Sequence, residues 1–149
     1  LGLSARMSEL HAAVGLWSVR RVPERGNARL ARIEIYQDRL GALPGCWVQE
    51  LPNDRTTSGN YFVLFITDRA RINRDTVYKK LQQAGIQTKR YFHPPVHEQT
   101  LFKQWPTRMS SDLSHTERAS LEGLALPLYS HMTLEQLDTV CRAVEESLQ

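Results

Sequence analysis

The densest group of chemically capable side chains is the segment Arg90-Tyr-Phe-His-Pro-Pro-Val-His97. Two histidines four residues apart could bind one metal ion together. Pro94 and Pro95 lie between them, however, and exclude the regular helix that would place both imidazoles on one face. The spacing therefore predicts no metal site in this segment.

Two interpretations of the same segment stay open. It could be a proline-stiffened loop with a buried aromatic side chain and with its histidines at the surface. Alternatively, it could line a pocket that belongs to a larger assembly. Tyr, His and Arg favour the second interpretation, because these side chains can hold a sugar hydroxyl or a phosphate.

A second candidate group lies near the beginning of the sequence, where Ser4 and Arg6 stand at the start of a predicted helix. The free N–H groups and the dipole of a helix N-terminus favour a bound anion. Ser4 could also serve as the N-cap of that helix, and the two roles are compatible. The sequence contains no Walker loop, Gly-x-Gly-x-x-Gly, His-Glu-x-x-His or Gly-x-Ser-x-Gly motif, so no catalytic residue is predicted.

Two helices are predicted at the beginning of the chain. The first spans about residues 5–21, and its apolar residues recur at helical spacing at Met7, Leu10, Val14 and Trp17. Pro23 suits the first turn of the second helix, which ends near Gly41 and Pro44. Five arginines recur along this stretch, but glutamates are interleaved with them. We therefore interpret them as a solvated helix face and expect no nucleic-acid partner.

The rest of the sequence predicts a small sheet with helices. Strands are expected at residues 47–51, 61–67 and 86–91, the second of them buried on both faces. Asn73 is a predicted N-cap of a helix that closes at Gly85, and capping boxes are predicted at 114–117 and 133–136. Residues 92–112 read as a loop with one helical turn near 98–103, and 124–128 as a brief apolar segment. The fold class is α+β, a small and mainly antiparallel sheet of about three strands covered by helices.

Bulk composition is that of a globular domain. The chain has 149 residues, 41% of them hydrophobic and 23% charged, with a mild net charge of +3. No apolar run approaches the ~18 residues of a membrane-spanning helix, so we expect no membrane partner. Cys46 and Cys141 lie far apart without His or Cys at metal-ligand spacing, which favours a reduced, cytoplasmic protein.

Several motifs in sequence order resemble those of the DegT/StrS sugar aminotransferases. Residues Gly2-Leu-Ser-Ala-Arg-Met-Ser-Glu-Leu-His-Ala-Ala-Val-Gly-Leu16 resemble the family signature Gly-x-Asn-x-(Arg/Lys)-Met-(Ser/Thr)-(Glu/Asp)-x-Gln-Ala-Ala-x-Gly. Further matches follow in the family's order and extend over the whole chain: Tyr36, Arg74-Asp75, Ala84-Gly85-Ile86, Tyr91-Phe-His-Pro-Pro-Val-His97 and Leu126-Pro-Leu128.

The resemblance implies a parent enzyme of fold type I that uses pyridoxal phosphate. Such an enzyme moves an amino group, usually from glutamate, to a keto group of a nucleotide-linked sugar. Its Schiff-base lysine and its pyridine-binding Asp belong to a large N-terminal domain, and Lys79, Lys80, Lys89 and Lys103 do not stand in the Schiff-base motif. We therefore expect an inactive fragment, with linker helices at 1–43, the C-terminal small domain at 44–149 and the large domain absent.

The resemblance also implies roles for individual residues. Ser4 occupies the position of the family's Asn, which reaches the cofactor phosphate of the neighbouring subunit, and Arg6 takes the motif's basic position near the subunit interface. Tyr91, His93 and His97 match the loop that faces the active-site mouth, and they are the candidates for sugar-nucleotide contact. The expected partners are the chain's own large domain and a second subunit in a homodimer. No cofactor is expected to bind the fragment itself.

Two alternatives remain beside the aminotransferase. One is a stand-alone dimerisation or binding module that has lost its catalytic half. The other is a family variant that acts as a deoxysugar dehydratase, in which His replaces the Schiff-base lysine. The residue at the Schiff-base position, upstream of this sequence, distinguishes the aminotransferase from the dehydratase. If the large domain is missing, an apolar patch around Leu10, Val14 and Trp17 should be exposed.

Overall fold

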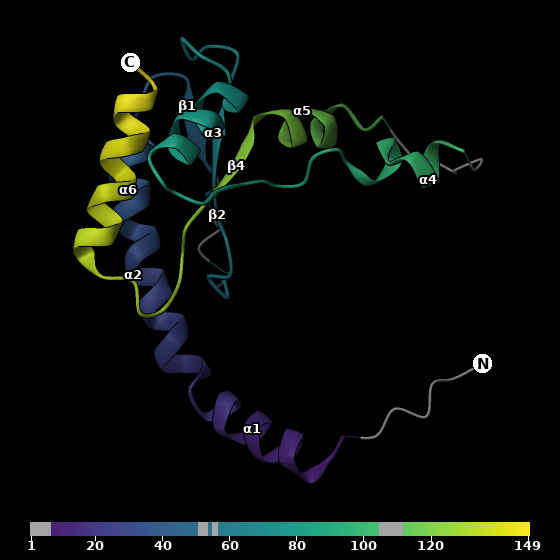
Figure 1. The fold of residues 1–149 in the computed structure, drawn as a ribbon, viewed down its shortest axis with the longest axis vertical. Coiled ribbons are helices and arrows are strands. Elements are labelled where there is room, and N and C mark those ends of the chain that lie inside the picture. The colour runs from purple at the N-terminus through teal and green to yellow at the C-terminus, as the bar shows by residue number, and fades with distance from the viewer. Residues whose placement is uncertain (1–6, 51–53, 55–56, 105–111) are drawn as a thin grey trace.

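The computed structural model describes residues 7–50, 54, 57–104 and 112–149. Ser4 and Arg6 lie outside these ranges. A small sheet lies at the centre, long helices cover one of its faces, and the first helix leads away from it (Figure 1). No helix within the described ranges is both long and apolar enough to cross a membrane.

The sheet has four antiparallel strands in the order β1-β2-β4-β3. They are β1 (Cys46–Val48), β2 (Phe62–Ile66), β3 (Lys89–Arg90) and β4 (Gly123–Leu126). The predicted fold class is confirmed, with one more strand than expected. The added strand is β4, which the sequence showed only as a brief apolar segment. All four of its residues are buried between β2 and β3, so burial on both faces removes the alternating pattern that marks a strand.

Strand β2 was predicted to be buried on both faces, and this is wrong for one face. Phe62, Leu64 and Ile66 are buried, whereas the alternate residues Val63 and Phe65 are only half-buried. On that second face Trp47 of β1 stacks on its cross-strand partner Phe65, with ring centroids 4.0 Å apart. The helices therefore form the core against one face of the sheet only.

Three helices build that core: α2 (Val22–Leu40), α3 (Arg74–Gln83) and α6 (Leu134–Ser147). Helix α6 packs against both α2 and α3. Tyr36 of α2 is fully buried, stacks on Phe62 and donates its hydroxyl hydrogen to the carbonyl of Pro127 at 2.8 Å. Burial raises the pKa of the Tyr36 hydroxyl. The apolar side of α6 faces this core through Leu137, Val140, Cys141 and Val144.

The predicted helix ends are confirmed at two of three capping sites. Asn73 accepts a hydrogen bond from the Thr76 amide and Gly85 has a positive φ of 75°, while Thr133 and Gln136 form the full capping box of α6. The box predicted at Ser114 is wrong. The carboxylate of Asp112 accepts from both the amide and the hydroxyl of Ser114, so Ser114 lies inside α5 (Ser114–Glu122) as its first residue.

Helix α1 (Glu9–Arg20) begins later than predicted, because Ser8 is its N-cap and accepts from the amide of His11. The residue that caps this helix is Ser8, and the N-cap role considered for Ser4 falls on a residue outside the described ranges. Helix α1 has no buried residue. Leu10, Val14 and Trp17 are 81%, 64% and 50% exposed, which confirms the exposed apolar patch.

Candidate functional site

Strand β3 leads into the segment 91–97, where aromatic rings gather at the surface. The ring of Tyr91 lies between those of Tyr61 and Phe92, with centroid distances of 4.5 and 4.0 Å. Phe92 is 66% exposed, so the interpretation with a buried aromatic side chain is wrong. The loop buries Pro95 instead. The second interpretation, a loop that lines a pocket, agrees with this arrangement.

A cavity of about 430 Å³ adjoins these rings. The two cationic side chains of Lys89 and Arg90 line it, together with a half-buried Tyr91 and an exposed His93. The guanidinium of Arg90 lies 5.2 Å from the ring centroid of Tyr78, which also lines the cavity. Aromatic faces can stack on planar rings and cations can bind phosphate, so the cavity can accept a ligand that carries both.

This environment affects the hydroxyl of Tyr91. Partial desolvation and the neighbouring Tyr61 hydroxyl raise the pKa of the Tyr91 hydroxyl above its ordinary value. The phenol is therefore neutral at physiological pH, and it can both donate and accept a hydrogen bond at the cavity wall.

The structure brings Tyr91 and His93 together at one cavity but gives His97 a different partner. His97 lies in the short 3₁₀ helix η1 (Val96–Glu98), and its Nε2 is 3.2 Å from a carboxylate oxygen of Glu117 at the start of α5. Ligand atoms of His97, Glu98 and Glu117 lie within 4.8 Å of one another. Spacing in the sequence pairs His97 with His93 and does not indicate that Glu98 and Glu117 lie beside His97. The predicted absence of a metal site stays a prediction.

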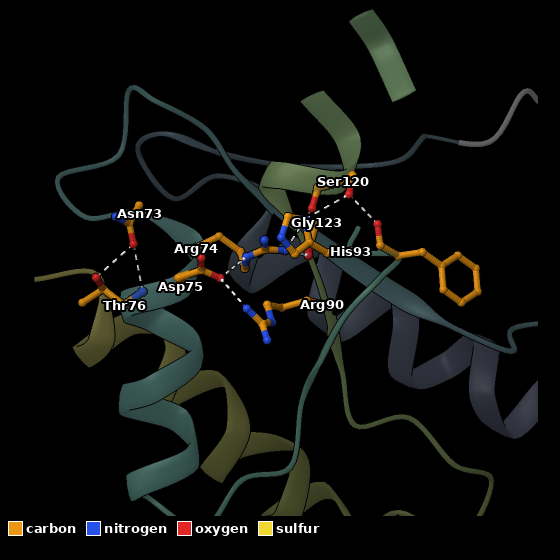
Figure 2. Close-up of polar contacts among 9 residues, drawn as sticks. Asn73, Arg74, Asp75, Thr76, Arg90, His93, Ser120 and Gly123 are labelled. Carbon is orange, nitrogen blue, oxygen red and sulfur yellow. Dashed lines mark hydrogen bonds and ion pairs between the residues drawn. The ribbon is translucent and has the colours of Figure 1, made fainter. Parts of the chain in front are cut away.

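Behind the loop lies a buried cation, Arg74, in the first turn of α3. It is only 3% exposed, and its Nε donates to Asp75 at 2.8 Å. Its Nη1 donates to the backbone carbonyls of Ser120 and Gly123, at 3.1 and 2.8 Å, where α5 ends and β4 begins (Figure 2). Burial lowers the pKa of the Arg74 guanidinium and Asp75 opposes this effect. The cation thus binds one carbonyl in the last turn of α5 and one at the start of β4, near the end of the helix that attracts positive charge.

Ser120 connects this cation to the loop. Its hydroxyl donates to the carbonyl of Phe92 at 2.5 Å and lies 3.3 Å from Nδ1 of His93 (Figure 2). Gly123 permits the close approach, because a Cβ there would lie 2.8 Å from the carbonyl oxygen of Ala119 and 3.1 Å from that of Tyr91. The end of α5 therefore packs directly on the backbone of the loop.

Sequence reasoning missed Ser120 as a site residue and noted Arg74 only as part of a motif. A signal existed for Arg74, because a cation in the first turn of a helix opposes the helix dipole and needs another partner. Ser120 gave no such signal, since its loop partner Phe92 lies 28 positions earlier in the chain. The predicted cofactor residues Ser4 and Arg6 lie outside the described residues.

Comparison with known proteins gives a consistent result. A family model described as the DegT/DnrJ/EryC1/StrS aminotransferase family matches residues 1–145. GDP-perosamine synthase of Caulobacter vibrioides is 29% identical to this chain, over 99% of the chain and 39% of the relative. The 3-oxo-glucose-6-phosphate:glutamate aminotransferase of Bacillus subtilis is 30% identical, over 93% of the chain and 31% of the relative.

Solved structures agree with the sequence relatives. The crystal structure of DesI in the presence of its TDP-sugar product matches with a TM-score of 0.86 at 28% identity. The match covers 99% of this chain and 38% of the DesI chain. The chain therefore spans 31–39% of the length of these relatives.

Proposed function

Because this chain belongs to the DegT/DnrJ/EryC1/StrS aminotransferase family, we propose that it forms the C-terminal small domain of a sugar aminotransferase. The enzyme moves an amino group to a keto group of a nucleotide-linked sugar. The names of the sequence relatives support this, because one is named for GDP-perosamine and the other for 3-oxo-glucose-6-phosphate. Glutamate is the proposed amino donor, as in the name of the Bacillus relative.

The observation that carries the proposal is the cavity beside Tyr91. The exposed rings of Tyr61 and Phe92 offer stacking surfaces, and Lys89 and Arg90 offer positive charge for a diphosphate. His93 adds a polar group for a sugar hydroxyl. One cavity thus combines the contacts that a nucleotide-linked sugar needs. His97 lies against Glu117 instead, and its proposed sugar contact remains a prediction.

Pyridoxal phosphate is the proposed cofactor of the whole enzyme, and it would serve as the electron sink of amino transfer. The residues of this chain do not fit its covalent attachment. All four lysines are exposed, and Lys80 donates to the carbonyl of Ser147, whereas a Schiff-base lysine is activated by desolvation or by another nearby cation. We propose that the lysine and the pyridine-binding Asp lie in a large domain outside these 149 residues, and that Ser4 and Arg6 reach the cofactor phosphate of a second subunit.

The exposed apolar face of α1 supports this division. Leu10, Val14 and Trp17 form a surface that the rest of the described chain does not cover. We propose that the chain's own large domain covers it and that residues 1–43 serve as linker helices to the small domain at 44–149. The C-terminal half of α2, with Tyr36 and Leu40, packs in the core of the small domain. A homodimer in the cytoplasm is the proposed state of the whole enzyme.

A chimera tests the proposal. Residues 1–149 replace the matching segment of Caulobacter GDP-perosamine synthase, and amino transfer to a nucleotide-linked keto sugar is measured. We expect transfer, with KM for the sugar raised about tenfold by Lys89→Ala through loss of a charged phosphate contact. Lys103→Ala is the matched control, because Lys103 is also an exposed lysine but lies on α4 (Thr100–Lys103) and does not line this cavity, so its loss should leave KM unchanged.

Two outcomes would contradict the proposal. The first is a folded chimera without transfer while the same chimera built with the DesI segment is active. The second is equal behaviour of the two lysine variants. In the whole protein, Lys at the Schiff-base position supports the transaminase, and His there supports the dehydratase alternative.

A further inference from the structure

We propose that Ser120 is a positioning residue that fixes the imidazole of His93 as its Nδ1–H tautomer and leaves Nε2 free to accept a hydrogen bond. The inference deepens the proposed function, and it rests on that function only for the identity of the ligand, a sugar hydroxyl. The tautomer itself follows from contacts within this chain.

The first step is the proton balance at the Ser120 hydroxyl. A serine hydroxyl has one proton to donate and can accept hydrogen bonds on its oxygen. Here the proton is donated to the carbonyl of Phe92, which has no proton of its own and can only accept. The contact between the Ser120 oxygen and Nδ1 of His93 must then be donated by His93. The neutral imidazole therefore carries its proton on Nδ1.

The second step is that Ser120 holds its place. Its residue is only 4% exposed, and its carbonyl accepts a hydrogen bond from Arg74. Arg74 is held in turn by Asp75, whose carboxylate also lies 3.7 Å from Arg90, the residue two positions before Phe92. The beginning of the loop is thus linked to the same buried cation by two routes, through Asp75 to Arg90 and through Ser120 to Phe92 and His93 (Figure 2).

The third step is the hydrogen-bonding character that this gives the cavity. Lys89 and Arg90 can only donate, which suits phosphate oxygens. A sugar hydroxyl also needs a group that accepts its proton. Nε2 of His93 is such an acceptor once Nδ1 carries the hydrogen, in addition to the hydroxyl oxygen of Tyr91. Ser120 therefore influences ligand selection from behind the loop, without lining the cavity of about 430 Å³ itself.

Nitrogen-15 NMR of the imidazoles in this chain tests the inference without any substrate. The chain has five histidines, and the signal missing from His93→Gln identifies His93. At a pH where the ring is neutral, we expect a pyrrole-type shift for Nδ1 and a pyridine-type shift for Nε2. The opposite pattern in the wild-type chain would overturn the inference, with no variant needed.

Variants sharpen the test. Ser120→Ala should move His93 towards the Nε2–H tautomer that free histidine prefers in water, and Ser120→Thr should restore the wild-type pattern because it keeps the hydroxyl. Ser114→Ala is the matched control, since Ser114 lies on the same helix but its hydroxyl donates to Asp112. An unchanged tautomer in a folded Ser120→Ala chain would also overturn the inference.

The effect of Ser120 on amino transfer is measured in the chimera with Caulobacter GDP-perosamine synthase. Ser120→Ala should raise KM for the sugar roughly three- to tenfold with kcat nearly unchanged, as expected for the loss of one neutral hydrogen bond in binding. An Nδ1–H tautomer in an inactive chimera would support this inference and contradict the proposed function. An active chimera in which His93 carries Nε2–H would do the reverse.

Discussion

Helices α1 and α6 have similar apolar spacing in the sequence and opposite surroundings in the structure. Leu137, Val140 and Val144 of α6 are at most 5% exposed, whereas Leu10 and Val14 of α1 are 81% and 64% exposed. Helical periodicity shows that a face is apolar, but it does not show what covers that face. Among the described residues, the apolar side of α6 is covered by the rest of the chain, whereas that of α1 stays exposed.

The largest expected effect separates the two helices by stability. Leu137→Ala should lower the free energy of unfolding by about 2–5 kcal/mol, because it opens a cavity in the core. Leu10→Ala is the same chemical change on α1 and should stay within about 0.5 kcal/mol of the wild type. Urea unfolding of both variants measures the difference. A comparable loss for Leu10→Ala would show that α1 is packed in solution.

The second prediction concerns how α6 is joined to α2. Arg39 of α2 bonds to Asp138 and Glu145 of α6, at 2.6 and 2.8 Å. Hydrogen bonding to Arg39 lowers the pKa of the Asp138 carboxylate in the folded state. Its contribution to stability is therefore present above the unfolded pKa near 3.9 and is lost as the pH falls through the folded value.

Asp138→Asn should thus destabilise the chain slightly at pH 7 and not at all at low pH. Unfolding curves of both proteins at pH 7 and near pH 2.5 measure this convergence. Asp68→Asn offers a control, because Asp68 is an exposed carboxylate outside α6. A stability gap that widens as the pH falls would contradict the assignment.

Substitutions on the exposed face of α1 should have the smallest effect on stability. Their effect is measured through self-association of the chain. The chain should self-associate as its concentration rises, since Leu10, Val14 and Trp17 expose a joined apolar surface. Leu10→Ser should reduce this association and leave the unfolding midpoint unchanged. Sedimentation velocity over a wide concentration range measures it. A strictly monomeric wild-type chain would contradict the prediction.

Local capping signals in the sequence predicted two of three helix starts, and distant contacts were not visible in it. Asn73 and Thr133 cap their helices through residues three positions away, so their roles could be predicted. Strand β4 was missed because its pairing with β2, and not any pattern of its own four residues, makes it a strand. At Ser114 the competing carboxylate of Asp112 decided where the helix begins.

The candidate site shows the same division. Tyr91 and His93 were predicted from their types and motif, and the structure places both at one cavity. The residues that orient them were not found, because Arg74 reaches Gly123 across 49 positions. Such a contact forms only in the folded chain, so no spacing of residues in the sequence indicates it.

The way Arg74 binds α5 has a consequence for how this domain can diversify. Its two acceptors there are backbone carbonyls, which every amino acid supplies, so the arginine tolerates changes of side chain at position 120. The hydroxyl of Ser120, by contrast, acts only on the loop. The scaffold and the ligand preference are thus encoded by different atoms of one residue. Evolution can alter the second by single substitutions while inheriting the first intact.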